Sequence, residues 1–107
     1  MALDAYDRSL ELLHLIAALL EKLAKRDADL AKQLRRAAHS VPLNIVEANR
    51  RRGQDRAHLF RVALGSAAEV GGCLDVAVAL EYVDASDVAS AHALLDRVRA
   101  MTYRLSR

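Results

Sequence analysis

Apolar residues recur every three or four positions in four segments of the chain, with polar residues between them. This spacing places the apolar positions on one side of an α-helix, the side that packs against other helices. Short polar breaks with capping residues separate the segments at residues 27–29, 50–54 and 84–87. The pattern predicts four amphipathic helices, over residues 5–25, from Asp27 or Asp29 to Asn49, over 56–82 and over 88–105.

The first segment carries two apolar stripes. The first stripe is predicted to face the core, and the second lies beside it, so the apolar face is wider than one bundle seam requires. The surplus is either buried deeply within the chain's own bundle or used in a subunit contact. The first stripe comprises Tyr6, Leu10, Leu13, Ala17, Leu20 and Ala24, and the second comprises Leu12, Ile16, Leu19 and Leu23.

The second and third segments contain residues that disturb regular helices. Pro42 lacks a backbone N–H, so it predicts a kink near residues 40–42, or two shorter helices in place of one. Gly53 marks the break before the third helix, with Gln54 or Asp55 as the expected cap. Three further glycines lie within the predicted third helix. Glycine lowers helix stability and is usually tolerated there where another backbone approaches closely, so these residues predict a close helix crossing. They are Gly65, Gly71 and Gly72.

The composition is typical of a wholly helical protein. Ala and Leu are abundant, and aromatic residues make up only 4% of the chain, which is sparse for a sheet. The 107 residues suffice for one domain with its own core, and the sequence contains no internal repeat and no low-complexity tail. Short connections make neighbouring helices antiparallel. We predict an all-α fold, one domain over residues 1–107, built as an antiparallel up-and-down four-helix bundle.

Three further features bear on location. No uninterrupted apolar run approaches the roughly 18 residues that cross a bilayer, and the longest covers only residues 15–20. The first residues lack the basic start and the cleavage site of a secretory signal. The single cysteine, Cys73, lies among apolar residues, where a buried small side chain is favoured over a reactive thiol. Together these features predict a soluble cytoplasmic protein without a membrane span.

Basic residues are concentrated around the second break. Between residues 35 and 61 the chain has seven arginines against only Glu47 and Asp55, although its net charge is +2. Arginine holds phosphate through paired hydrogen bonds, so the segment predicts contacts with a nucleic-acid backbone. A solvated turn, or ion pairs with neighbouring acids, would explain the same charges. The candidate nucleic-acid-binding residues are Arg35, Arg36, Arg50, Arg51, Arg52, Arg56 and Arg61.

The sequence contains no motif for a metal, a cofactor or nucleophilic catalysis. The four histidines fall on four different predicted helices, without metal-ligand spacing. Ser40 and Ser66 lack the base and orienting group of a nucleophilic site. Arg52 and His58 have the spacing of the ribonuclease motif of HEPN-type helical toxins. Three Arg-to-His pairs of this kind occur, where chance gives about one to two. We expect neither catalytic residues nor a bound metal or cofactor.

The second helix resembles the signature of a known family. Residues 33–47 read Gln-Leu-Arg-Arg-Ala-Ala-His-Ser-Val-Pro-Leu-Asn-Ile-Val-Glu. This string is similar to the signature of the four-helix bundle family named for 23S rRNA intervening sequences. Downstream, the arginines at 51–52, Phe60, and residues 64–69 and 80–82 resemble the family's basic turn, its Phe, its Gly-Ser-x-x-Glu segment and the end of its third helix. The resemblance covers nearly the whole chain. It departs at Ala-Asn in positions 48 and 49, where the family usually has Glu-Gly.

The resemblance implies a left-handed bundle that assembles into a ring-like homopentamer. It also implies kinship with the accessory proteins of diversity-generating retroelements, which bind nucleic acid and a reverse transcriptase. We therefore expect a non-enzymatic, oligomeric protein that binds RNA or DNA. The alternatives are a protein-interaction scaffold, such as a reverse-transcriptase accessory subunit, and a HEPN-type ribonuclease.

Polar residues within the signature are expected to have structural roles. Asn44 and Glu47 are polar positions in an otherwise apolar helix, and satisfying backbone groups that Pro42 leaves open would be a sufficient reason for them. Ser40 is assigned to the same structural group. Glu69, on the third helix, could instead pair with an arginine of the second.

Overall fold

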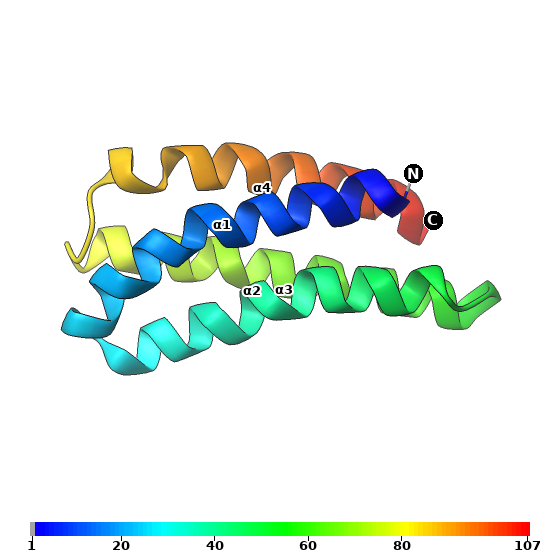
Figure 1. Cartoon of the computed structure of the whole chain (residues 1–107), viewed down its shortest axis with the longest axis horizontal. Coiled ribbons are helices and arrows are strands. Elements are labelled where there is room, and N and C mark those ends of the chain that lie inside the picture. Colours follow the sequence, from blue (N-terminus) through cyan, green and yellow to red (C-terminus); the bar gives the residue numbers. More distant parts are fainter. Residues whose placement is uncertain (1) are drawn as a thin grey trace.

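Four long helices account for nearly all of residues 2–107, which are the residues that the computed structural model describes (Figure 1). The helices are α1 (Ala2–Arg26), α2 (Ala28–Asn49), α3 (Gly53–Ala79) and α4 (Ala85–Ser106). Each helix packs against two others, in the cyclic order α1, α2, α3, α4, and consecutive helices run in opposite directions (Figure 1). The predicted all-α, antiparallel up-and-down four-helix bundle is confirmed.

Apolar side chains from all four helices meet in one core. The core stripe of α1 is the one containing Leu12, Ile16, Leu19 and Leu23, all of which are buried. In the other stripe Tyr6, Leu13 and Leu20 are half-buried, whereas Leu10, Ala17 and Ala24 are exposed. The expectation that the stripe beginning at Tyr6 faces the core is therefore wrong. The stripe of larger aliphatic residues is turned inward because it removes more apolar area from water.

Helix α2 begins where the sequence predicts and runs through its proline without a break. Asp27 caps it, because its Oδ1 accepts a hydrogen bond from the Leu30 N–H at 3.0 Å. Pro42 is buried inside a continuous helix, so the alternative of two shorter helices is wrong. Its ring faces α1, since it shares a surface hollow with Tyr6 and Leu13.

The polar residues of α2 tie this helix to α3. Asn44 Nδ2 donates to the carbonyl oxygen and to Oγ of Ser40, at 2.8 and 2.9 Å. Ser66 of α3 donates to the same Ser40 Oγ at 2.6 Å. The carbonyl that lacks its usual donor because of Pro42 is that of Ala38, so Asn44 does not fill the gap as expected. The serine and asparagine side chains instead fix the register between α2 and α3.

Helix α3 starts earlier and ends earlier than predicted. Arg52 occupies the N-cap position without a side-chain hydrogen bond, and Gln54 and Asp55 already lie in the helix, so neither is the cap. At the other end Glu81 has a φ of 60°, and the Tyr82 N–H donates to the Ala77 carbonyl at 2.9 Å. This hydrogen bond ends the helix at Ala79 rather than Tyr82.

The glycines of α3 support a close crossing at one position only. A Cβ atom on Gly71 would lie 3.3 Å from Leu95 Cδ2 of α4, tighter than most such contacts. A Cβ atom on Gly65 or Gly72 would meet nothing within 4 Å. Close packing therefore explains Gly71 and leaves the other two unexplained.

The sequence analysis expected no segment that could span a membrane, but helix α3 meets a criterion of length and mean hydropathy. Among the described residues, it is the one helix long and apolar enough to cross a membrane by length and mean hydropathy. An uninterrupted apolar run is a stricter criterion than mean hydropathy, because the few polar residues of α3 break such runs without lowering the mean hydropathy much. Phe60, Val70 and Leu74 of this helix lie fully buried in the bundle core, as in a core helix of a globular protein.

The end of the bundle that holds the α1–α2 turn and the α3–α4 connection is cross-linked by side chains (Figure 1). The Tyr82 hydroxyl donates to Asp27 Oδ2 at 3.1 Å, and this hydrogen bond raises the pKa of Tyr82. The guanidinium of Arg26 lies 5.3 Å from the centroid of the Tyr82 ring. The hydrogen bond joins residues that are 55 positions apart in the chain.

Helix α4 begins with a carboxylate whose contribution depends on pH. Asp87 Oδ2 accepts a hydrogen bond from the Asp84 N–H at 2.8 Å and lies 3.6 Å from Lys22 Nζ. These contacts hold the pKa of Asp87 below its usual value, the backbone hydrogen bond first. A carboxyl group with a lowered folded-state pKa stabilises the fold at neutral pH. That stability is lost as the pH falls through the folded-state pKa.

We therefore expect Asp87→Asn to lower the melting temperature at pH 7, with the difference from wild type disappearing at about pH 2. Thermal unfolding followed by circular dichroism at both pH values measures this. Asp96→Asn, on the exposed side of the same helix, is the charge-matched control. A deficit of Asp87→Asn that persists at low pH would show that the carboxylate charge is not its cause.

Candidate nucleic-acid interface

The turn between α2 and α3 is an exposed arginine cluster at the opposite end of the bundle (Figure 1). Arg50, Arg51 and Arg52 are consecutive and exposed, and Gly53 then turns the chain into α3 with a φ of 60°. Glycine adopts this left-handed conformation without strain. Arg56, one turn into α3, has its guanidinium 4.9 Å from the centroid of the Phe60 ring. We call Arg50, Arg51, Arg52 and Arg56 the arginine tip.

Two acids, Glu47 and Asp55, lie beside the four arginines of the arginine tip and leave it a net charge of +2. Arg51 Nε lies 2.9 Å from Glu47 Oε2, and this hydrogen bond raises the pKa of Arg51. Both partners are about half exposed, at 53% and 45%, so water and salt screen the pair and a phosphate can compete for Arg51. Within residues 2–107, no ion pair involves Arg50 or Arg52. The tip therefore presents exposed guanidinium groups to an anion.

The seven arginines selected from the sequence do not form one patch. Arg35 and Arg36 are exposed near the middle of α2, about 21 Å along the helix from Arg50. Arg61 lies about two turns into α3 and is also exposed. The expectation of a single cluster is wrong for these three residues, because positions close in sequence are spread along the length of a helix.

Further arginines, missed in the sequence analysis, lie at the same end of the bundle. Residues 97–107 contain four arginines and no acid, and the last turns of α4 lie at the end that carries the arginine tip (Figure 1). Arg107 lies over Tyr103, with its guanidinium 5.8 Å from the ring centroid. In the sequence, these arginines are visible as a basic segment without acids. Their relation to the arginine tip follows only from the position of α4 in the bundle. The four are Arg97, Arg99, Arg104 and Arg107.

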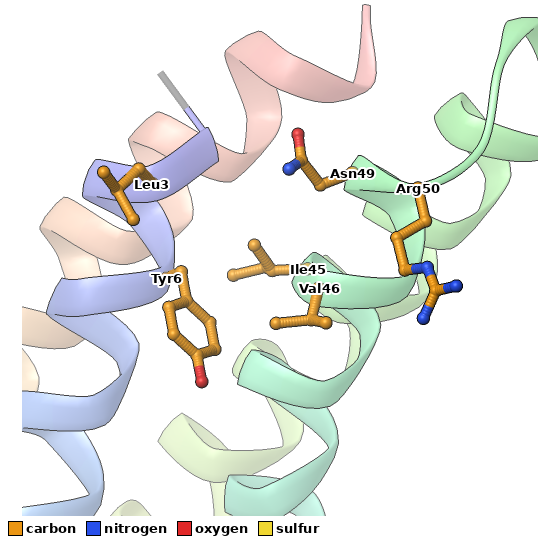
Figure 2. A pocket seen from close by; sticks show the side chains of 6 residues that line it. All are labelled: Leu3, Tyr6, Ile45, Val46, Asn49 and Arg50. Carbon is orange, nitrogen blue, oxygen red and sulfur yellow. The ribbon is translucent and has the colours of Figure 1, made fainter.

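A shallow apolar groove follows the junction of α1 and α2. It consists of four hollows, and successive hollows share Tyr6, then Leu13 and His39, then Leu20 and Arg35. Figure 2 shows the hollow nearest the arginine tip, where Tyr6 of α1 faces α2 and the guanidinium of Arg50 points away from α1. The apolar residues exposed along the groove are Leu3 (60%), Leu10 (40%), Leu43 (67%) and Val46 (40%). The stripe of α1 that the core leaves out therefore forms one wall of this groove.

The two outer edges of the groove carry opposite charges. The α1 edge exposes Asp7 and Glu21, and the α2 edge exposes Lys32, Arg35 and Arg36. Glu11 and Arg8, which pair at 2.8 Å, line a separate hollow between α1 and α4. Arg35 and Arg36 form no ion pair with any residue from 2 to 107. The groove therefore has an apolar floor between an acidic and a basic edge.

The residues considered for catalysis are not assembled into a site. Cys73 is buried, and burial raises the pKa of its thiol, which disfavours the reactive thiolate. No hydrogen bond or ion pair of the described chain joins Arg52 to His58 or Glu69 to an arginine of α2. His92 Nε2 instead lies 3.1 Å from Asp75 Oδ1, between α4 and α3. Across residues 2–107 no three His, Cys, Asp or Glu side chains are placed to hold a metal ion.

One comparison with known proteins shows the fold of the chain, and another shows its family. The chain resembles the crystal structure of a protein of unknown function from the S23 ribosomal protein family of Bacteroides thetaiotaomicron. The TM-score is 0.85 and the identity 22%, over 96% of this chain and 98% of that one, which shows a shared fold. No curated protein matches the chain. The model of the 23S rRNA-intervening sequence protein family matches residues 1–104. The chain therefore belongs to the 23S rRNA-intervening sequence protein family.

Proposed function

We propose that this chain is a non-enzymatic, cytoplasmic nucleic-acid-binding protein that contacts phosphates through the arginine tip. The observation that carries the proposal is the arginine tip itself, in which Arg50 and Arg52 are exposed without an acidic partner. Arginine forks bind phosphate oxygens through paired hydrogen bonds and provide affinity without base specificity. RNA is the first ligand to test, because the family is named for an intervening sequence of ribosomal RNA.

We further propose that the protein acts as a homo-oligomer, most simply the homopentamer that the family resemblance implies. The α1–α2 groove supports this proposal, because it exposes Leu3, Leu10 and Leu43 between edges of opposite charge. Burying these side chains against a second copy would remove apolar area from water. A ring would also repeat the arginine tip around one axis, and several linked tips bind one nucleic acid far more tightly than a single tip.

A protein-interaction scaffold is the second candidate, since the same apolar groove could hold a different protein, such as a reverse transcriptase. Light scattering of the purified protein with and without a short RNA, at low and high salt, separates the two functions. A pentamer-sized particle that gains the mass of RNA only at low salt is expected. A particle that ignores RNA at low salt would overturn the nucleic-acid proposal and favour the scaffold.

Leu43→Glu is expected to reduce the particle mass towards that of one chain. Leu43 is 67% exposed, so the change costs the isolated bundle little, whereas a charge in the middle of an apolar contact opposes assembly. The measurement is the mass by light scattering at several protein concentrations. Val76→Glu, at a 44% exposed apolar position of α3 outside the groove, is the control and should leave the mass unchanged. An unaltered mass for Leu43→Glu would exclude the groove as the subunit contact.

A further inference from the structure

The packing of α3 against α4 defines which residues lie side by side near the arginine tip. His92 of α4 contacts Asp75 of α3, and Leu95 lies against Gly71. In an antiparallel pair both helices rise by the same amount per residue, so each step forward on α4 matches a step back on α3. Continuing this register places residue 103 level with residues 63–64, and residue 107 level with residues 59–60.

One side of α4 combines two arginines with an exposed aromatic ring. Arg99, Tyr103 and Arg107 follow one another at four-residue intervals, which aligns them along one side of the helix. Arg99 also lies seven residues after His92, so this is the side that faces α3 at the Asp75 contact. We call Arg99, Tyr103 and Arg107 the Tyr103 stripe. It runs along the α3–α4 junction towards the arginine tip.

Arg61 belongs to the same surface. It lies fourteen residues before Asp75 on α3, close to four helical turns, so both side chains point to the α4 side. The register places Arg61 level with residues 105–106, next to the level of Arg107, and about 12 Å from the start of α3. The acids on this side are Asp96, one turn before Arg99, and Asp75, which is paired with His92. The stripe is therefore positive from Arg99 to its end nearest the arginine tip.

Tyr103 has the properties of a stacking platform. Its side chain is 57% exposed, and it is the most exposed aromatic residue of the described chain. The guanidinium of Arg107 lies 5.8 Å from the ring centroid, the range of a cation–π contact. An exposed ring between arginines can stack a base while the arginines hold the adjoining phosphates. A duplex keeps its bases inside the helix, so such a surface selects unpaired bases.

We propose that the Tyr103 stripe, together with Arg61, binds single-stranded nucleic acid, with one base stacked on Tyr103 and phosphates held by Arg99, Arg107 and Arg61. This proposal rests on the proposed function, because it specifies which nucleic acid that surface prefers. The arginine tip contacts phosphates of paired and unpaired strands alike. The Tyr103 stripe adds affinity for unpaired strands only.

The test measures binding of labelled oligouridine, of oligothymidine and of a duplex of equal length to the whole protein by fluorescence anisotropy. Tyr103→Ala is expected to bind both single strands about tenfold more weakly, the loss typical of one stacked base, and to bind the duplex like wild type. Loss on both RNA and DNA is expected because stacking needs no 2′-hydroxyl. Tyr103→Phe keeps the ring and should bind like wild type.

Two charge-matched variants test the arginines of α4. Arg99→Ser removes a charge from the Tyr103 stripe, whereas Arg97→Ser removes one from the side of α4 that borders α1, next to Arg8 and Leu94. Arg99→Ser should weaken single-strand binding more than Arg97→Ser. Equal binding of single strands by Tyr103→Ala and wild type would overturn the stripe while leaving the arginine tip intact. Absence of binding to every oligonucleotide by the wild-type protein would overturn the proposed function itself.

Discussion

Replacement of Arg50, Arg51 and Arg52 together with Ser is expected to weaken RNA binding on the order of 100-fold at low salt. Each arginine that neutralises a phosphate releases condensed counterions, so losing three contacts also lowers the slope of log affinity against log salt by about 2 for a single strand. The measurement is the dissociation constant for oligouridine over a series of salt concentrations. The fold should be unaffected, since all three residues are exposed and lie outside the helices.

A second triple variant separates the arginine tip from net charge. Lys22, Lys25 and Lys32 are exposed and remote from the turn between α2 and α3, and their replacement with Ser removes the same three charges. This variant should keep most of the affinity and most of the salt slope. Equal losses in the two triples would mean that RNA responds to overall charge rather than to the arginine tip.

Phe60→Ala is expected to lower the free energy of unfolding by about 3–5 kcal/mol. Phe60 is 0% exposed and is among the largest fully buried side chains, so its removal leaves a cavity between α3 and its neighbours. A domain of this size has about 5–15 kcal/mol of stability in total, so the loss would be a large fraction of it. Urea unfolding followed by circular dichroism measures the change.

The matched control for Phe60→Ala is Val62→Ala. Val62 lies in the same helix but is 36% exposed, so its truncation should cost well under about 1 kcal/mol. The Arg56 guanidinium lies 4.9 Å from the centroid of the Phe60 ring. Phe60→Leu removes this ring contact while keeping an apolar residue in the core. Similar stability losses for Phe60→Ala and Val62→Ala would contradict the core packing described above.

Helix ends could be predicted from the sequence where a typical capping residue stands at the end of the helix. Asp27, one of the two expected starts, is the N-cap of α2, and Asp84, within the expected break at residues 84–87, is the N-cap of α4. The start of α3 was misplaced because Arg52 stands at the N-cap, where no capping residue signals a helix. Its end was misplaced because Glu81 adopts the left-handed conformation that usually marks a glycine.

The choice between the two stripes of α1 shows a different limit. Both are apolar and both repeat at helical spacing, so periodicity alone does not determine which one faces the other helices. Only packing against the neighbouring helices shows that the stripe with Leu12 and Ile16 is buried rather than the stripe with Tyr6 and Leu10. The width of the apolar face, in contrast, was visible from the sequence and corresponds to the α1–α2 groove.

The candidate site was predicted in part for a related reason. Consecutive arginines at 50–52 are close in space because a tight turn holds them, so sequence proximity was a good guide there. Arg35 and Arg36 were grouped with them although a helix separates the two sets. Arg99 and Arg107 were missed because their place beside α3 depends on antiparallel packing, which sequence spacing does not show.

The side-chain links between Tyr82, Asp27 and Arg26 fasten the α1–α2 turn to the α3–α4 connection. These links lie at the end of the bundle opposite the arginine tip (Figure 1). A phosphate bound at the tip would therefore act on exposed side chains far from them. The entropy lost on binding would fall on a few guanidinium groups rather than on the core.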